Sequence, residues 1–260
     1  MKIALLILAL ITAVAGIAAA AVRYATEPLT WHQTFGAEGC CIDITHAGGL
    51  LDGEPYTNSL EALRQNYSAG RRIFEIDLSL TADGRIVLAH DWNAYGGVAP
   101  DSSEFLKQGP LTRLDLDGFL AWLRLECAGC RVVTDAKFDF VHFRDAFFHR
   151  VPVPESRDRF ILQTYDFETV HALAELDPEQ PQILTLYRVR EVPDEELSRL
   201  AQVPGLLAVT MPIDRVPLQA ASTIEATGKP VFTHGYPWMM QSELILRTAR
   251  LFGITGFYKD

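Results

Sequence analysis

Basic residues are scarce in this chain of 260 residues, which has 23 Lys and Arg against 33 Asp and Glu and a formal net charge of −10. A nucleic-acid partner would require clustered Lys and Arg, and an anionic membrane surface would require a polybasic segment. The composition therefore argues against nucleic acid as a partner. An acidic protein can still bind a phosphate group when a divalent cation mediates the contact.

Internal repeats, low-complexity blocks and inner linkers are also absent, so we expect one domain over residues 40–260, after a linker over 24–39. The only long apolar run lies at the N-terminus, over residues 3–22, after Lys2. Its length is close to that of a membrane span, and its alanine-rich end resembles a cleavage region. Residues 1–23 are therefore predicted to form a signal peptide or a membrane anchor. We expect the rest to be exported to a periplasmic or other extracytoplasmic compartment, anchored in the inner membrane if the segment is uncleaved.

Cysteine is rare too, with four residues arranged as two close pairs, Cys40 with Cys41 and Cys127 with Cys130. Exported proteins can keep disulfides, and two bonds joining the pairs would tie the start of the domain to its middle. A zinc site of four thiolates is a weaker alternative, because adjacent cysteines are poorly spaced for tetrahedral ligation. Free or mixed thiols also stay open.

The most informative segment is an apolar strand that contains two acidic residues. Over residues 73–80, apolar side chains alternate with polar ones, which places Glu75 and Asp77 on the same face of a strand. A turn at residues 82–84 then leads into a second apolar run that ends at His90. Because burying unpaired charge is costly, two carboxylates in such an apolar segment indicate a function, such as binding one shared cation.

Short apolar runs alternate with longer amphipathic segments through the rest of the chain, a pattern typical of a parallel sheet. The predicted strands are Cys41–His46, Ile73–Leu80, Ile86–His90, Val132–Phe138, Phe160–Thr164, Ile183–Tyr187, Leu206–Thr210 and Val231–His234. The predicted helices are Asn58–Ala69, Asp115–Leu125, Asp166–Leu176, Asp194–Ala201, Leu218–Ala226 and Gln241–Leu251. This number of strands favours a single closed (β/α)8 TIM barrel of the α/β class, preceded by the N-terminal signal or anchor helix.

In such a barrel, functional side chains gather where the strands end at their carboxyl side. The polar residues predicted at these ends are His46, Glu75, Asp77, His90, Asp135 and Lys137. Alternation again places Asp135 and Lys137 on one face, where they could simply pair with each other. His234 falls at the end of the last predicted strand, where it could line the pocket or pack in the core.

The order of these motifs resembles that of the glycerophosphodiester phosphodiesterases, a family of phospholipase-C-like TIM-barrel phosphodiesterases. The similar stretches are His46-Ala47-Gly48, Tyr56-Thr57-Asn58-Ser59, Glu75-Ile76-Asp77-Leu78, Thr81-Ala82-Asp83-Gly84, His90-Asp91 and Asp135-Ala136-Lys137. Weaker similarity continues through residues 161–166 and 253–260, so the resemblance covers nearly everything after residue 40.

The resemblance implies metal-dependent hydrolysis of phosphodiesters, with glycerophosphodiesters or phospholipid headgroups as the small-molecule or lipid partner. It assigns one divalent cation, Mg²⁺ or Ca²⁺, to Glu75, Asp77 and Asp135, because hard cations prefer oxygen ligands. His46 and His90 would be the general acid and base. Lys137 would neutralise phosphate charge. We also expect Asn58, from the matched motif, and His234, from its place at a strand end, to contact the substrate.

Two alternatives stay open. A phospholipase-D-like lyase would form cyclic phosphates by attack of the substrate's own hydroxyl, and a catalytically reduced, membrane-tethered barrel would only bind its ligand. Three departures from the family pattern bear on them: Ala47 replaces an arginine, Thr57 replaces a glutamate, and Asp135 replaces a longer glutamate. The missing guanidinium matters most, because an arginine can bind a phosphate with two parallel hydrogen bonds.

Overall fold

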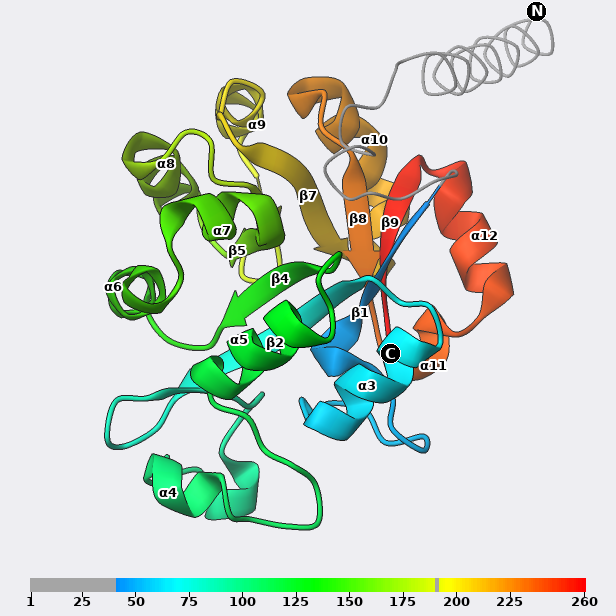
Figure 1. Cartoon of the computed structure of the whole chain (residues 1–260). Coiled ribbons are helices and arrows are strands. Elements are labelled where there is room, and N and C mark those ends of the chain that lie inside the picture. Colours follow the sequence, from blue (N-terminus) through cyan, green and yellow to red (C-terminus); the bar gives the residue numbers. More distant parts are fainter. Residues whose placement is uncertain (1–40, 190–191) are drawn as a thin grey trace, which may run out of the picture. The chain divides into compact units, whose positions relative to one another are not determined.

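The computed structural model describes residues 41–189 and 192–260, which form a closed barrel of eight parallel strands surrounded by helices (Figure 1). The predicted TIM-barrel fold is confirmed. The predicted signal or anchor over residues 1–23 and the linker over 24–39 lie outside the described residues. In the described part of the chain, no helix combines the length and the hydrophobicity that a membrane crossing requires.

The barrel closes between its first and last strands. β1 pairs in parallel with β9 on one side and with β2 on the other, and every other neighbouring pair around the barrel is parallel as well. The barrel strands are β1 (Ile42–Thr45), β2 (Ile73–Leu80), β4 (Arg131–Ala136), β5 (Phe160–Thr164), β6 (Gln182–Thr185), β7 (Leu206–Pro212), β8 (Val231–His234) and β9 (Ile254–Lys259).

One predicted barrel strand is not part of the barrel. β3 (Ile86–Leu88) pairs antiparallel with β2 and forms the second strand of a hairpin. The turn between them is short, and a parallel neighbour would need a long crossover connection. The eighth barrel strand is β9, which the sequence analysis did not include among the strands. This strand contains Gly256, where only glycine fits because a Cβ atom would collide with the ring of Phe232. Since glycine is unfavourable inside strands, it weakens the sequence signal for β9.

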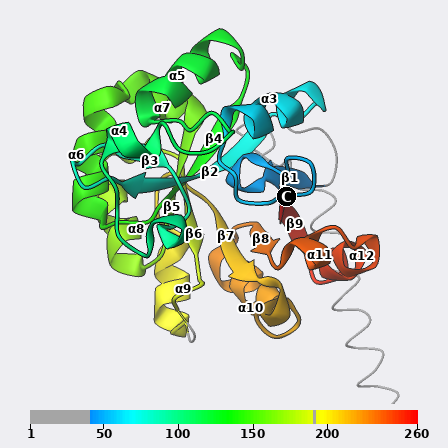
Figure 2. The same cartoon turned by 90° about the horizontal axis from the view of Figure 1, so that it is seen from below.

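Helices cover the outside of the barrel, as Figures 1 and 2 show from two directions. Several begin at a capping side chain: Ser59 accepts a hydrogen bond from the Ala62 amide and Asp115 accepts one from the Gly118 amide. Two helices between β4 and β5 were not predicted. The α-helices are α3 (Leu60–Ser68), α4 (Ser102–Phe105), α5 (Leu116–Leu125), α6 (Phe140–Arg150), α7 (Val153–Arg159), α8 (Phe167–Leu176), α9 (Asp194–Leu200), α10 (Val216–Thr227), α11 (Pro237–Met240) and α12 (Glu243–Leu251), and the 3-10 turns are η1 (His46–Gly48), η2 (Asn93–Tyr95) and η3 (Ile213–Arg215).

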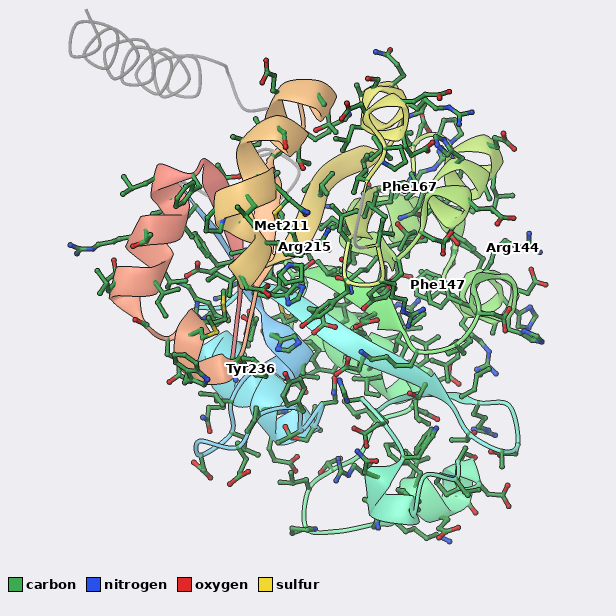
Figure 3. All side chains as sticks on the ribbon, turned by 180° about the vertical axis from the view of Figure 1, so that it is seen from behind. Arg144, Phe147, Phe167, Met211, Arg215 and Tyr236 are labelled. Carbon is green, nitrogen blue, oxygen red and sulfur yellow. A yellow bond between two sulfur atoms is a disulfide. The ribbon has the colours of Figure 1, made fainter. Side chains whose placement is uncertain are left out.

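The hydrophobic core lies between the strands and the helices. Phe74 and Ile76 of β2 point outward and pack in one cluster with Trp122 of α5 and Phe147 of α6. Figure 3 shows the two sides of α6, with Phe147 directed toward the barrel and Arg144 directed away from it. Because side chains alternate along a strand, this packing leaves the carboxylates of β2 facing the barrel interior.

The described cysteines do not follow the predicted pairing. Cys127 and Cys130 form a disulfide with each other across a short turn, with their Cα atoms 5.4 Å apart. A bond from either of them to the start of the domain is therefore wrong, and so is a zinc site that uses all four thiolates. Cys40 lies outside the described residues.

Candidate active site

Three acidic side chains meet inside the barrel. Glu75 and Asp77 come from β2, and Asp135 comes from β4, where the strand register places it directly beside Asp77. Their carboxylate oxygens lie within 4.8 Å of one another, and all three residues are buried. The structure thus brings together the three residues that were predicted as metal ligands.

Some carboxylate oxygens of this acidic triad (Glu75, Asp77 and Asp135) accept no hydrogen bond from the described residues. Glu75 Oε1 and Asp135 Oδ1 have no hydrogen-bond partner among the described residues. Burial, together with the negative charge of Asp77, raises the pKa of Glu75 to about 8. Buried carboxylate oxygens without protein partners are the ligands that Mg²⁺ and Ca²⁺ prefer, so these residues fit the divalent cation implied by the resemblance.

Lys137 provides a positive charge beside the triad. Its Nζ atom lies 2.8 Å from Asp77 Oδ1 and 2.6 Å from Asp135 Oδ2. Burial opposes its charged form, but the nearby charges of Asp135 and Asp77 outweigh this effect and raise the pKa of Lys137 above its usual range. Lys137 is therefore a permanent cation in the site.

His46 directly follows β1 and lies between two carboxylates. Its Nδ1 atom is 2.9 Å from Asp260 Oδ1, and its Nε2 atom is 3.9 Å from Glu75 Oε2. Burial lowers the pKa of His46, but the hydrogen bond to Asp260 and the negative charges around it raise the value to about 9. The Nε2 atom therefore faces the triad while Nδ1 is engaged by Asp260.

The backbone after His46 binds the triad through an amide group. Ala47 adopts a left-handed conformation, with φ of 49°, and its amide donates a hydrogen bond of 2.7 Å to Glu75 Oε2. The methyl side chain of Ala47 is completely buried. Ala47 thus contributes to the site through its backbone amide.

Asn58 is bound to the triad through both ends of its amide. Its Nδ2 atom donates to Asp77 Oδ2 at 2.8 Å, and its Oδ1 atom accepts from the Asp77 amide at 3.2 Å. This geometry fixes the orientation of Asp77. The substrate contact that the resemblance assigns to Asn58 stays a prediction.

His90 lies at the rim of the site, in the loop after β3. Its Nδ1 atom is 2.9 Å from Asp91 Oδ2, and both side chains are about half exposed. The ring of Tyr56 contacts both predicted catalytic histidines, with its centroid 4.9 Å from that of His46 and 4.9 Å from that of His90. Both imidazoles therefore have Nδ1 paired with an aspartate and contact the same tyrosine ring.

His234, at the end of β8, lies on another side of the site. Its ring stacks on Tyr187 with the centroids 4.0 Å apart. Burial, together with the positive charge of His46, lowers the pKa of His234 to about 3, so the ring is neutral. Its Nε2 atom is buried and has no hydrogen-bond partner within the described ranges, and the substrate contact predicted for His234 stays a prediction.

A partly buried hydrogen-bond chain beside the triad was not predicted from the sequence. The Tyr258 hydroxyl donates to Gln163 Oε1 at 3.0 Å, and Gln163 Nε2 donates to the Tyr165 hydroxyl at 2.8 Å. Burial raises the pKa of Tyr165 above its usual range, and so do the charge of Asp135 and a hydrogen bond to it. The contacts of Asp260 and Tyr56 were not predicted either. The sequence signals near these residues are the weak family similarity over 161–166 and 253–260, which include Tyr165 and Asp260, and the motif at 56–59, which includes Tyr56.

Comparison with known proteins agrees with this fold. No family model matches the sequence, and no curated protein matches it either. Among solved structures, a protein from Galdieria sulphuraria assigned to the glycerophosphodiester phosphodiesterases is 16% identical, with a TM-score of 0.70 over 84% of this chain and 93% of that one. The glycerophosphodiester phosphodiesterase of Thermotoga maritima is 16% identical, with a TM-score of 0.66 over 86% of this chain and 96% of that one.

A third similar structure contains a ligand. It is a phosphodiesterase from Oleispira antarctica in complex with the product sn-glycerol-3-phosphate, 16% identical, with a TM-score of 0.66 over 84% of this chain and 92% of that one. These identities establish the shared fold. The predicted resemblance to the glycerophosphodiester phosphodiesterases is confirmed at that level.

Proposed function

We propose that this chain hydrolyses phosphodiesters with one divalent cation bound by Glu75, Asp77 and Asp135. The observation that supports it best is the convergence of three buried carboxylates beside the His46 imidazole, with His90 on the same tyrosine ring as His46, in a fold shared with glycerophosphodiester phosphodiesterases. A purely structural ion cluster would leave fewer buried carboxylate oxygens without partners, because such atoms are costly.

The side chains around the triad can perform the proton transfers of the reaction. A bound divalent cation would act as a Lewis acid toward the phosphoryl oxygens. Lys137 would neutralise charge on the same oxygens as it redistributes in the transition state. His46 and His90 each have Nδ1 paired with an aspartate, so Nε2 is the atom left to exchange a proton. One would accept a proton from the nucleophile, and the other would donate one to the leaving alkoxide on the opposite side of phosphorus.

Glycerophosphodiesters or phospholipid headgroups are the substrates that we propose. The ligand of the Oleispira antarctica phosphodiesterase, sn-glycerol-3-phosphate, supports this class. With water as the nucleophile, hydrolysis of a glycerophosphodiester would release glycerol phosphate and a free alcohol. The choice between Mg²⁺ and Ca²⁺ belongs to the same proposal, because the all-oxygen triad suits both ions.

Phosphorus NMR of the products tests this function. Purified protein is incubated with glycerophosphocholine and with a lysophospholipid, with Mg²⁺, with Ca²⁺, or with a chelator. We expect glycerol phosphate from glycerophosphocholine and lysophosphatidic acid from the lysophospholipid, each formed only with the cation, and loss of turnover in the His46→Ala and His90→Ala variants. A cyclic phosphate product would instead indicate a lyase. Absence of turnover on both substrates, with wild-type protein that binds the cation, would reject hydrolysis and favour a binding module.

We also propose that the chain acts outside the cytoplasm. The apolar run over residues 3–22 and the Cys127–Cys130 disulfide support this location, because disulfides persist in oxidising compartments. If the segment is uncleaved, it would also hold the domain at a membrane, near lipid substrates. Cell fractionation followed by N-terminal sequencing of the mature protein tests both points.

A further inference from the structure

We propose that Tyr56 is a positioning residue whose ring holds His46 and His90 at their working separation; its role in catalysis rests on the proposed function. The Tyr56 ring meets His46 edge-on, with an interplanar angle of 81°, and meets His90 at a tilt of 60°. Both centroid distances are 4.9 Å, so the two imidazoles can be no more than twice that distance apart.

The two histidines depend on this ring to different degrees. The His46 side chain is only 20% exposed and is fixed by Asp260, and its ring also meets Tyr258 at 6.4 Å. His90 is 42% exposed, and its other contact on its own loop is the exposed Asp91. An exposed side-chain contact of this kind contributes little to fixing a side chain. The Tyr56 ring is therefore the contact that orders His90 relative to His46.

The loop that holds Tyr56 is tied to the acidic triad. Tyr56 has φ of 59° and Asn58 has φ of 47°, a left-handed conformation that is unfavourable for a bulky side chain. Asn58 compensates by bonding Asp77 through both amide atoms, and its own amide donates to the Ala47 carbonyl at 3.2 Å. The strained backbone thus fixes Tyr56 relative to the carboxylates and to His46.

The ring and the hydroxyl of Tyr56 can be separated by substitution. Burial and the nearby negative charges of Asp260 and the triad raise the pKa of Tyr56 to about 12, so its hydroxyl is neutral at physiological pH. Tyr56→Phe keeps the ring that contacts both imidazoles and removes only the hydroxyl. Tyr56→Leu removes the ring and keeps an apolar side chain.

Steady-state kinetics of these variants with divalent cation and a chromogenic phosphodiester test the proposal. Since a misplacement of about 1 Å can cost a hundredfold in rate, we expect Tyr56→Leu to lower kcat about 100-fold and to change KM less than about threefold. Tyr56→Phe is expected to stay within about threefold of wild type in kcat. A Tyr56→Leu variant with wild-type kcat would overturn the proposal, and so would a Tyr56→Phe variant that is as slow as Tyr56→Leu.

Tyr67→Leu is the matched control. Like Tyr56, Tyr67 is a partly exposed tyrosine with two ring contacts, to Trp122 and to Arg72, but it lies on α3 in the outer layer. It is expected to lose stability without losing kcat. A fall in kcat as large as that of Tyr56→Leu would show a general packing effect and contradict the proposal.

Crystal structures of the Tyr56 variants provide a readout that needs no activity, so failure of the proposed function would not hide the outcome. In Tyr56→Leu we expect the His90 imidazole to leave its single conformation while the triad keeps its geometry. In Tyr56→Phe we expect both imidazoles in place. An unchanged His90 in Tyr56→Leu would overturn the positioning role.

Discussion

The Nδ1 atom of His46 lies 2.9 Å from Oδ1 of Asp260, although 214 positions separate the two residues in the chain. Their meeting follows from barrel closure, because β1 pairs with β9 and the register sets Thr45 beside Lys259. The next residue of each strand is then His46 on one side and Asp260 on the other. A buried carboxylate on Nδ1 fixes both the tautomer and the orientation of an imidazole.

Asp260→Asn is expected to lower kcat by about 100-fold or more, because a neutral amide neither fixes the tautomer nor stabilises the imidazolium. The same change should lower the pKa of His46 from about 9, since the hydrogen bond to Asp260 and its charge both favour the protonated ring. Proton NMR titration of the cation-free protein measures this shift. A His46 pKa that stays the same in the variant would contradict the role given to Asp260.

Glu75→Gln is expected to stabilise the cation-free protein at alkaline pH while abolishing turnover. The folded pKa of Glu75 is raised from 4.5 to about 8, so the ionised group is disfavoured in the folded state, and stability falls as the pH rises through this window. Glutamine removes this cost, on the order of a few kcal/mol, and keeps an oxygen for the Ala47 amide.

Thermal unfolding in a chelator at pH 5 and pH 9 measures this effect. We expect the melting temperature of the Glu75→Gln variant to exceed that of wild type by more at pH 9 than at pH 5. Adding divalent cation should close the gap by stabilising wild type alone. A difference in melting temperature that is equal at both pH values would show that ionisation of Glu75 does not destabilise the folded protein.

Asn58→Ala is expected to weaken cation binding by about 10- to 100-fold, because Asp77 loses the partner that orients it. The change also leaves the buried amide of Asp77 without its acceptor, at a cost of about 1–3 kcal/mol in unfolding free energy. Calorimetric titration with the cation and chemical denaturation check the two effects. Unchanged cation affinity in a folded variant would contradict this role for Asn58.

Lys137→Met should change cation affinity and turnover in opposite directions. Its ammonium group lies against Asp77 Oδ1 and Asp135 Oδ2, so it competes with a cation for those oxygens, and its removal should tighten cation binding. Turnover should fall by about 100-fold, because the transition-state charge loses a preorganised donor. Parallel titration and kinetic measurements compare the two. A variant that loses cation affinity would show that Lys137 supports the metal site instead.

The acidic triad could be predicted because its signals are local in sequence. Glu75 and Asp77 share a face through simple alternation, and Asp135 occupies the same level of the adjacent barrel strand. A parallel barrel places the carboxyl ends of its strands at one rim, so strand-end residues far apart in the chain are expected to meet. The hairpin of β2 and β3 likewise brings His90 back toward the acidic residues of β2.

Asp260 and Tyr56 could not be predicted in the same way. The contact of Asp260 depends on which strands close the barrel. Because the sequence pattern predicts a barrel strand at β3 and none at β9, it does not indicate that Asp260 lies beside His46. The contact of Tyr56 depends on a loop with positive φ at Asp52, Tyr56 and Asn58. Residues other than glycine seldom adopt this conformation, so no sequence pattern indicates where such a loop places its side chains.

The most direct test of the central claim, that the triad binds a single cation, is a Mn²⁺ titration followed by electron paramagnetic resonance. Free Mn²⁺ gives a sharp signal that disappears on binding, so the ions bound per chain can be counted. Wild-type protein is predicted to bind one ion tightly, and the Asp77→Asn variant is predicted to lose that site while keeping its fold. A wild-type protein that binds none, or an Asp77→Asn variant that binds as wild type does, would contradict the account.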